Sequence, residues 1–301
     1  MKNVLVTGGA GFIGSHLCEG LLARGYKVRV LDSLVYGWRG DVPPQAEFLQ
    51  GDIRDLESCR RAAAGMDGVF HCAAMSRAGP SQEQIEICTG SNITGTQNML
   101  LAARDAGVRR FIYAGSSTYY GNRPVPHRES DPPDLLNIYG LTKRVGEQYC
   151  LLFDQGLGLA CVVMRYFNVY GPRQPQTGAY ALVLGIFLNR HAKGEVLEIH
   201  GDGSQRRDFV HVRDVVAANI LAYERANEDG VRGEIFNVGS GENLSVQELA
   251  DMISSRQIHT AARQGDSAAT LADISKIKAV LGWAPQVRFA EGLKELKALT
   301  P

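Results

Sequence analysis

A tyrosine and a lysine four residues apart are the first candidates for chemistry in this sequence. They lie in the stretch Asn137-Ile138-Tyr139-Gly140-Leu141-Thr142-Lys143. If a helix begins here, Tyr139 and Lys143 lie one turn apart on the same face. A nearby ammonium group favours the phenolate and lowers the pKa of a tyrosine from its usual value of about 10. The pair could then serve as a general acid or base, although a surface tyrosine beside a solvated lysine has the same spacing.

A glycine-rich turn near the amino terminus has the pattern of a phosphate-binding loop. An apolar strand runs into it, and a helical pattern follows it: Thr7-Gly8-Gly9-Ala10-Gly11-Phe12-Ile13-Gly14. Gly8 and Gly11 allow a tight turn whose N–H groups can approach a pyrophosphate. That pyrophosphate would lie at the positive end of the helix that begins near Phe12, and Gly14 would let the helix pack closely on the strand.

The second strand, residues 27–31, ends in Asp32. This carboxylate would accept hydrogen bonds from the adenosine ribose and repel a 2′-phosphate, so NAD is favoured over NADP. A glycine motif indicates dinucleotide binding when it lies in a particular order of elements. Here that order is present: a strand, the glycine loop, a helix, a second strand and an acid. The alternative is an ordinary glycine-rich turn followed by an aspartate at the end of a strand.

Strands and helices continue to alternate, which predicts an α/β fold. Further strands are expected at 47–49, 68–71, 110–114 and 160–165, and long helices at 92–106 and 138–155. We therefore expect a Rossmann-like, doubly wound parallel sheet with a smaller, mixed α/β substrate lobe. The expected NAD-binding domain covers 1–166 plus about 209–240. The expected substrate lobe covers about 167–208 plus 241–301.

Small or polar side chains follow three of these strands, at the edge where such folds bind ligands. The small residues Ala73 and Ala74 suit a loop that lies against a cofactor. Ser116 belongs to a hydroxyl cluster with Ser117 and Thr118, for which a serine-rich turn is the alternative. Asn168 follows the strand at 160–165, and its alternative is an asparagine that satisfies its own loop.

Composition argues against several classes of protein. Lys plus Arg and Asp plus Glu each total 32, so no net charge attracts nucleic acid or an anionic membrane. Apolar runs such as 181–188 are far shorter than the roughly 20 residues of a membrane span, and the amino terminus is a poor signal peptide. We expect a reduced, cytoplasmic protein without a structural metal, because no metal-binding spacing occurs among Cys18, Cys59, Cys72, Cys88, Cys150 and Cys161.

Together these motifs resemble the extended short-chain dehydrogenase/reductase family. Within it they are similar to the NAD-dependent nucleotide-sugar epimerases and dehydratases, of which the UDP-galactose 4-epimerases are the best-known type. The resemblance spans essentially the whole chain. Beyond the motifs above, it rests on Gly51-Asp52-Ile53, His71-x-Ala73-Ala74, Asn92, Arg165-Tyr166-Phe167-Asn168-Val169-Tyr170-Gly171-Pro172, Arg207-Asp208-Phe209-Val210-His211, Phe236-Asn237-Val238-Gly239, Ala272-Asp273-Ile274 and Leu281-Gly282-Trp283.

The resemblance implies a role for each matching position. Tyr139 would be the catalytic acid/base, Lys143 would modulate its pKa and contact a ribose, and Ser116 would bind the sugar hydroxyl that is oxidised. Asp52 and Ile53 would bracket the adenine of NAD. The other implied NAD-binding residues are Gly8, Gly11, Phe12, Ile13, Gly14, Asp32, Ala73, Asn92 and Phe167.

The same resemblance implies a substrate site. Asn168 and Arg207 would hold a diphosphate, and Arg263 with Asp266 would lie near the nucleoside. A bidentate guanidinium is a natural diphosphate ligand. The alternative for Arg207 is an exposed arginine paired with Asp208.

The resemblance implies a UDP-hexose as the substrate. One departure from the family pattern favours a 4-epimerase, with tightly bound, recycled NAD and a transient 4-keto sugar, over a dehydratase. The 4,6-dehydratases usually carry an acidic pair after the active-site hydroxyl, and the decarboxylases a nearby glutamate, but this chain has Ser117 and Thr118. A 4,6- or 5,6-dehydratase with another acid remains the alternative, because the large Tyr119 suggests an unusual sugar pocket. Three further residues near the expected site are Cys72, Met75 and Cys88. We expect them to contribute to packing and not to the reaction.

Two further expectations concern activity and assembly. A non-catalytic NAD-binding sensor on the same scaffold is a third reading, but such a protein would be marked by degraded catalytic residues. Ser116, Tyr139 and Lys143 are all present. The resemblance also suggests a homodimer formed through the helices at 92–106 and 138–155.

Overall fold

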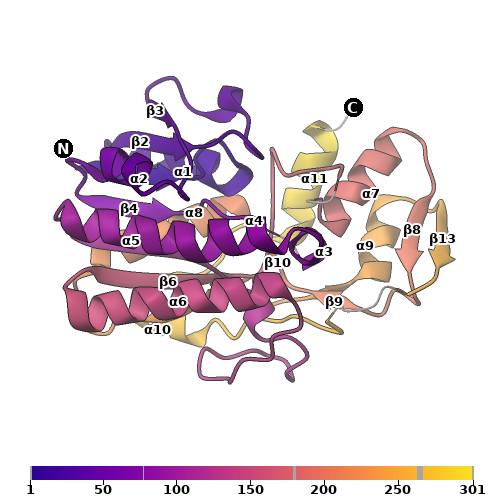
Figure 1. Ribbon diagram of the computed structural model, residues 1–301. Helices are drawn as coiled ribbons and strands as arrows, with labels where there is room; N and C mark the ends of the chain where they lie inside the picture. Colours follow the sequence, from indigo (N-terminus) through magenta and orange to yellow (C-terminus); the bar gives the residue numbers. More distant parts are fainter. Residues whose placement is uncertain (1, 77, 179–180, 263–266, 300–301) are drawn as a thin grey trace.

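Seven parallel strands form the central sheet of the computed structural model (Figure 1), which describes residues 2–76, 78–178, 181–262 and 267–299. All neighbouring strands in this sheet run parallel. This confirms the predicted Rossmann-like fold. In spatial order the strands are β3 (Glu47–Gln50), β2 (Lys27–Asp32), β1 (Asn3–Thr7), β4 (Gly68–His71), β5 (Arg110–Ser116), β6 (Ala160–Tyr166) and β11 (Ile235–Val238).

Helices cover both faces of this sheet. On one face lie α2 (Leu56–Ala63), α5 (Gly95–Asp105) and α6 (Ile138–Leu157), and Figure 1 shows α5 and α6 side by side across it. The other face is covered by α1 (Phe12–Ala23) and α8 (Val212–Arg225). Because helices cover both faces, the inner strands are mostly apolar, and every residue of β6 is buried. The edge strand β3 is only partly buried.

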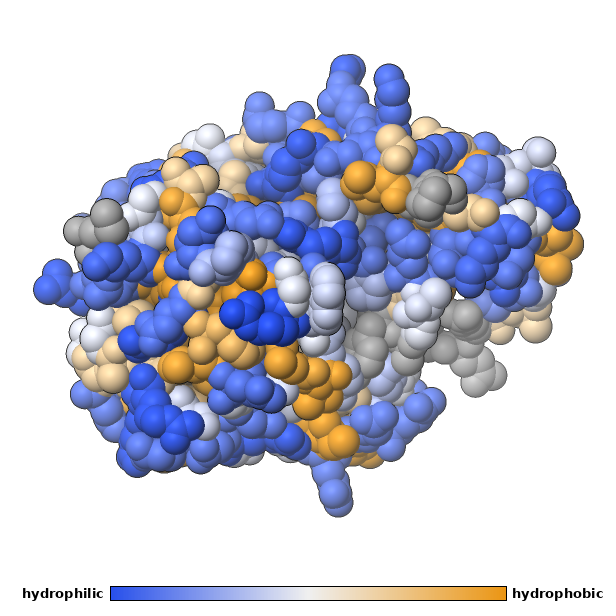
Figure 2. Space-filling model, turned by 90° about the horizontal axis from the view of Figure 1, so that it is seen from above, coloured by the Kyte–Doolittle hydropathy of each residue, from blue (hydrophilic) through white to orange (hydrophobic). Residues whose placement is uncertain are grey.

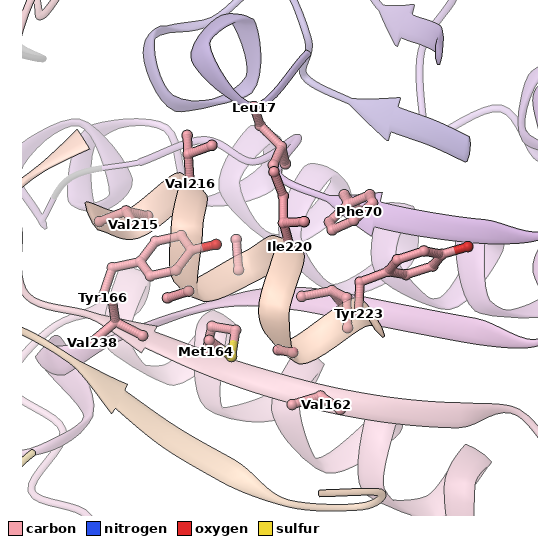
Figure 3. Packing of buried hydrophobic residues seen from close by; sticks show 14 of the residues in the cluster. Leu17, Phe70, Val162, Met164, Tyr166, Val215, Val216, Ile220, Tyr223 and Val238 are labelled. Atoms are coloured by element: carbon pink, nitrogen blue, oxygen red, sulfur yellow. The ribbon is translucent and has the colours of Figure 1, made fainter. Parts of the chain in front are cut away.

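Figure 3 shows how α1 and α8 close one face of the sheet. Leu17 of α1 points toward Ile220 of α8, while Phe70 of β4 packs on Tyr223, with their ring centroids 5.0 Å apart. A glycine in β4 makes this contact possible, because a Cβ at Gly68 would lie 2.1 Å from the Tyr223 ring. The helix pair is therefore fitted to the sheet by large side chains that meet small ones.

A smaller lobe lies beside the main body, to the right in Figures 1 and 2. It has its own apolar core, to which Leu184, Ile199 and Leu249 belong. Polar side chains cover most of the face seen in Figure 2, and apolar ones gather in smaller areas. The lobe contains α7 (Val183–Ala192), β8 (Leu197–His200), α9 (Val246–Ile253), β13 (Gln257–Thr260) and α11 (Phe289–Leu299).

Short strand pairs join the lobe to the main body. β7 (Asn168–Tyr170) pairs with β10 (Phe209–His211), and β9 (Arg206–Arg207) pairs with β12 (Leu244–Ser245).

No helix among the described residues is long and apolar enough to cross a membrane. The remaining short elements are η1 (Arg39–Asp41), α3 (Ala78–Glu83), α4 (Ile85–Thr89), the π turn η2 (Gly90–Thr94) and η3 (Ser117–Tyr119).

One segment departs from the predicted division of the chain, which assigned all of 241–301 to the lobe. Helix α10 (Ser275–Leu281) packs against β11 and α8, so it belongs with the main sheet. Ile277 and Trp283 are part of the main core, and the Trp283 indole donates a hydrogen bond to the carbonyl of Asp214. The sequence indicates that this segment has an apolar face, but not which core the face joins.

A buried ion pair fixes α6 on the sheet. The guanidinium of Arg165 on β6 donates two hydrogen bonds to Glu147 of α6, at 2.9 and 2.8 Å, and both side chains are at most 3% exposed. A third hydrogen bond joins Arg165 to the hydroxyl of Tyr120 at 2.7 Å. Burial disfavours the charge, but the bonds to Glu147 outweigh this effect and raise the pKa of Arg165. The arginine therefore stays charged inside the protein.

We predict that Glu147→Gln lowers the free energy of unfolding by about 3–5 kcal/mol, because it leaves the buried Arg165 charge without a counter-charge. Denaturant unfolding followed by circular dichroism measures this change. Glu57→Gln is the control, because Glu57 pairs with Arg60 on the surface, and its loss should cost less than about 1 kcal/mol. Equal effects of the two substitutions would contradict the prediction.

Candidate active site

A cleft of about 880 Å³ runs along the carboxyl ends of the central strands and continues between the main body and the smaller lobe. Its walls come from the glycine-rich turn and from the ends of β2, β4 and β5 on one side. Side chains of α7 and β8, including Phe187 and Arg190, line the other side. Ligands of open α/β sheets bind at this edge, so the residues that line the cleft form the candidate site.

The glycine-rich turn is shaped by close backbone contacts. Gly8 has a φ of +71°, and a Cβ at this position would lie 2.8 Å from the backbone nitrogen of Ala73. A Cβ at Gly14 would lie 2.1 Å from the carbonyl oxygen of Gly8, so only glycine allows α1 to begin so close beneath the turn. The amino end of α1, with Phe12 and Ile13, faces the cleft. Its N–H groups and helix dipole favour an anionic group there.

Asp32 ties this turn to the loop that follows β2. Its two carboxylate oxygens accept hydrogen bonds from the backbone N–H groups of Ala10, at 3.0 Å, and Leu34, at 2.8 Å. The side chain lines the cleft although the residue is only 8% exposed. Each carboxylate oxygen has a further lone pair, so Asp32 can still accept hydrogen bonds from a ligand hydroxyl.

Asp52 and Ile53 lie at the same end of the cleft. Hydrogen bonds from the side chain of Arg54, the shortest at 2.6 Å, lower the pKa of Asp52 and keep it ionised. Ile53 packs against α5 at Gly95, where a Cβ would lie 2.5 Å from the isoleucine side chain. Sequence reasoning missed Arg54 and Tyr36, which also line this end. Nothing in their spacing distinguishes them from ordinary surface residues.

The predicted helix begins as expected and carries Tyr139 and Lys143 into the cleft wall. Asn137 caps the helix, because its side-chain oxygen accepts a hydrogen bond from the N–H of Gly140 at 2.8 Å. A second cap comes from α3, where the hydroxyl of Ser81 accepts a hydrogen bond from the N–H of Tyr139 at 3.1 Å. The backbone of the tyrosine is thus held from two elements.

Lys143 is buried in this wall, with only 6% of the residue exposed. Burial disfavours the ammonium and lowers the pKa of Lys143 to about 8. The group is therefore still mostly charged at neutral pH. Its nitrogen lies 4.3 Å from the centre of the Tyr113 ring.

Ser116 ends β5 and lines the cleft with Ser117 and Thr118. Its hydroxyl lies 2.9 Å from the Thr118 hydroxyl and also caps η3 by accepting the N–H of Thr118 at 3.3 Å. The predicted hydroxyl cluster is therefore present and faces the cleft. It provides hydrogen-bonding groups but no acid.

Asn92 differs from the other predicted cofactor residues, because it lies behind the wall of the cleft with 1% exposure. Its amide oxygen accepts the N–H of Met75 at 2.8 Å. Its amide nitrogen donates to the Met75 carbonyl and to the Thr142 hydroxyl, both at 2.9 Å. In this structure Asn92 binds the loop after β4 to α6 and does not line the cleft.

Asn168 and Arg207 line the cleft at the boundary of the two lobes. The amide nitrogen of Asn168 donates to the carbonyl of Asp208 at 3.0 Å and to the hydroxyl of Thr270 at 3.2 Å, so both amide hydrogens are already used. Phe167, the other predicted residue of this strand end, also lines the cleft. Arg263 and Asp266 lie outside the described residues.

Asp208 is not the surface partner that sequence analysis offered as the alternative for Arg207. It is fully buried, and its carboxylate accepts three backbone N–H bonds, from Ser240, Gly241 and Ala272, and one from the Ser240 hydroxyl. Burial raises the pKa of Asp208, and these donors act in the opposite direction. The side chain fixes the turns that flank the cleft.

Tyr119 does not shape the pocket, contrary to the expectation drawn from its size. The centroid of its ring lies 3.7 Å from the guanidinium carbon of Arg165 and 5.1 Å from that of Arg144. The ring therefore packs in the charged cluster behind the site. Cys72 and Met75 line the cleft, while Cys88 is buried and lies 3.7 Å from the Thr142 hydroxyl.

The lobe adds polar residues that sequence reasoning missed. Arg190 of α7 forms an ion pair with Glu198 of β8 at 2.9 Å, and His200 ends the same strand with its ring 2.9 Å from the Thr260 hydroxyl. Arg190, Glu198 and His200 all line the cleft. A signal was available for His200, because it ends a short apolar strand just before a glycine turn.

Comparison with known proteins agrees with this geometry. A family model described as the NAD dependent epimerase/dehydratase family matches residues 4–239. The UDP-N-acetyl-alpha-D-glucosaminuronate decarboxylase of Bacillus cytotoxicus is 33% identical over 98% of this chain and 96% of its own length.

Two solved structures are similar over nearly their whole length. The UDP-glucose 4-epimerase of Thermotoga maritima, solved with UDP-glucose, has a TM-score of 0.93 and 36% identity, and the match covers 98% of this chain and 97% of the other. The UDP-glucose 4-epimerase of Thermus thermophilus, solved with NAD, has a TM-score of 0.90 and 35% identity, with 98% of both chains covered.

Proposed function

The chain belongs to the NAD-dependent epimerase/dehydratase family, and from this premise we propose that it is a nucleotide-sugar 4-epimerase that acts on a UDP-hexose. The observation that carries the proposal is the composition of the cleft wall near Ser116. Hydroxyl groups, a tyrosine and a charged lysine face the cleft there, and these groups can move a proton to and from a sugar hydroxyl. The UDP-sugar specificity is inferred from the similar proteins.

NAD is the cofactor of this family, and the residues of the cleft fit it. The close contacts at Gly8 and Gly14 make a turn into which a Cβ would not fit, beside the amino end of α1. We assign the pyrophosphate to this turn and the adenosine ribose to Asp32, whose carboxylate also disfavours the 2′-phosphate of NADP. When bound, NAD supplies a reversible hydride acceptor.

Tyr139 is the proposed acid/base. The charge of Lys143, one helical turn away, favours the phenolate, which takes the proton from the sugar hydroxyl at C4 as that carbon is oxidised. Ser116 hydrogen-bonds the same hydroxyl and orients it. After the keto sugar turns in the cleft, Tyr139 returns the proton to the oxygen as C4 is reduced on its other face. No net oxidation results.

Arg207 is the proposed ligand of the diphosphate, because a guanidinium can donate two parallel hydrogen bonds to phosphate oxygens. Asn168 remains a proposed neighbour of the diphosphate. In its present geometry its amide hydrogens bind Asp208 and Thr270, so a direct bond to phosphate requires the amide to change partners. Arg263 and Asp266, which lie outside the described residues, remain proposed contacts of the nucleoside.

The position of the carboxylates favours epimerisation over dehydration. Among the described residues that line the cleft, the carboxylates are those of Asp32, Asp52 and Glu198. Asp32 ends a strand three positions from β5, so the two strand ends are about 14 Å apart at the usual strand spacing. Glu198 belongs to β8 and is paired with Arg190. The distance of Asp32 from Ser116 and the pairing of Glu198 with Arg190 support the proposal of an epimerase over a dehydratase.

We also propose that the protein is a cytoplasmic homodimer. All six cysteines are free, which suits a reducing compartment. Exposed apolar side chains on α6, namely Leu141 at 45% and Leu152 at 61%, support a contact in which α5 and α6 meet the same helices of a second copy.

The substrate class is tested by incubating the purified protein with UDP-glucose, UDP-N-acetylglucosamine and UDP-glucuronate. We expect at least one of them to equilibrate with its C4 epimer without added reductant, as measured by nuclear magnetic resonance of the sugar protons. A product lighter by one water would instead identify a dehydratase. Inertness toward all three, with NAD still bound, would favour a non-catalytic sensor.

The acid/base assignment predicts that Tyr139→Phe lowers the epimerisation rate at least about a hundredfold, the scale of general acid–base catalysis, while NAD still binds. Initial rates and the NAD content of the purified protein measure both effects. Tyr149→Phe is the matched control, because Tyr149 lies on the same helix and packs against the core. A near-normal rate in Tyr139→Phe would exclude Tyr139 as the acid/base.

The proposed dimer predicts twice the mass of one chain in light scattering at working concentration. Leu152→Lys should shift the protein toward the monomer, because it buries a charge in the proposed contact. Met252→Lys is the control, because Met252 is 43% exposed on α9 of the smaller lobe. A monomeric mass for the unsubstituted protein would refute the dimer.

A further inference from the structure

The ring of Tyr113 lies directly beneath the ammonium group of Lys143. The lysine nitrogen is 4.3 Å from the ring centroid. Gly146 lets β5 and α6 approach this closely, because a Cβ there would lie 2.2 Å from the tyrosine hydroxyl oxygen. That hydroxyl donates a hydrogen bond of 3.3 Å to the carbonyl of Lys143. The ring is therefore fixed against the helical turn that carries the lysine.

Three titratable groups outside α6 that act on Lys143 are neutral: His71 at the end of β4, Cys72 in the loop after it, and Cys88 of α4. Burial, with a smaller effect from the charge of Lys143, lowers the pKa of His71 to about 3, so its imidazole is uncharged. Burial raises the pKa of Cys72 to about 12 and also raises that of Cys88, so both thiols keep their protons. None of these groups supplies a counter-charge to the ammonium.

On the helix side, Cys150 and Glu147 face the lysine. Among the described groups that act on Lys143, Glu147 is a carboxylate and can carry a negative charge. Its carboxylate, however, binds Arg165 and also pairs with Arg144. One carboxylate between two guanidinium groups leaves a net positive charge. The acid is therefore already neutralised by others and stabilises Lys143 only weakly.

The electron-rich face of an aromatic ring attracts a cation, and the attraction is strongest where water is excluded. Lys143 is 6% exposed and Tyr113 is fully buried, so their contact meets this condition. We propose that Tyr113 is a positioning residue for Lys143. The face of the Tyr113 ring stabilises the ammonium of Lys143 and holds it in the wall of the cleft. This role rests on the proposed function, in which a charged Lys143 favours the phenolate of Tyr139.

The sign of the effect follows from the charge. The ring favours the protonated lysine, so removing the ring face lowers the pKa of Lys143 further and the ammonium loses its proton at a lower pH. The phenolate of Tyr139 then loses its neighbouring charge at that lower pH. The alkaline limit of activity should therefore move downward.

The test compares three variants by direct titration of Lys143. Tyr113→Phe keeps the ring face, Tyr113→Leu removes it, and Phe111→Leu removes a neighbouring ring. Phe111 is on the same strand and the same side, with its ring 5.7 Å from that of His71. The pKa of Lys143 is read from the carbon resonance of labelled lysine beside its nitrogen, which Lys143→Arg identifies by its absence.

We expect the pKa of Lys143 to fall by about one unit in Tyr113→Leu, the scale of a desolvated cation–π contact. In Tyr113→Phe and Phe111→Leu it should stay close to the unsubstituted value. The alkaline limb of the epimerisation rate should shift in parallel. An unchanged Lys143 titration in a folded Tyr113→Leu protein would overturn the proposal.

Two further measures keep the test decisive. If Tyr113→Leu does not fold, Tyr113→Met replaces it, because methionine restores bulk without an aromatic face, and the same fall in pKa is expected. The titration needs no turnover, so it separates the two proposals. A shifted pKa without epimerase activity refutes the proposed function alone, whereas normal activity with an unshifted pKa refutes the role of Tyr113 alone.

Discussion

The buried pair between Arg165 and Glu147 is the interaction on which the arrangement of the site depends. It joins the strand at one wall of the cleft to the helix that carries Tyr139 and Lys143. A buried carboxylate and guanidinium gain little stability over an apolar contact, but their bidentate geometry tolerates little displacement. The pair lies one turn after Lys143, so it fixes both the height and the rotation of the helix on the sheet.

A second buried acid, Asp208, has the corresponding role at the other wall. The carboxylate of Asp208 holds two turns through Ser240, Gly241 and Ala272, next to Arg207 and Asn168. Both walls are therefore held by buried side chains that lie behind the cleft. Asn92 fits the same pattern, because its amide binds the loop after β4 to α6.

Much of the fold and of the cleft was predictable from the sequence. Alternating apolar strands and helices predicted the parallel sheet, and the motifs at the strand ends predicted Gly8, Asp32 and Ser116 in the cleft wall. Contacts between distant residues were not predictable. The same residue types suit a cleft residue or a buried tie, so nothing local distinguished Asn92 or Tyr119 from residues that touch a ligand. For the same reason the helix at 275–281 was assigned to the wrong core.

The return of α10 to the main sheet has a consequence for the modular use of this fold. The chain leaves the sheet after β6, comes back for α8 and β11, builds part of the lobe, and comes back again for α10 before α11 ends in the lobe. The smaller lobe is thus not a continuous segment that could be exchanged through a single pair of chain junctions. A hybrid with another substrate lobe must preserve each crossing, and a chain cut before α10 would expose the main core. Selection for new substrates is therefore expected to act through single side chains of the cleft more readily than through replacement of the whole lobe.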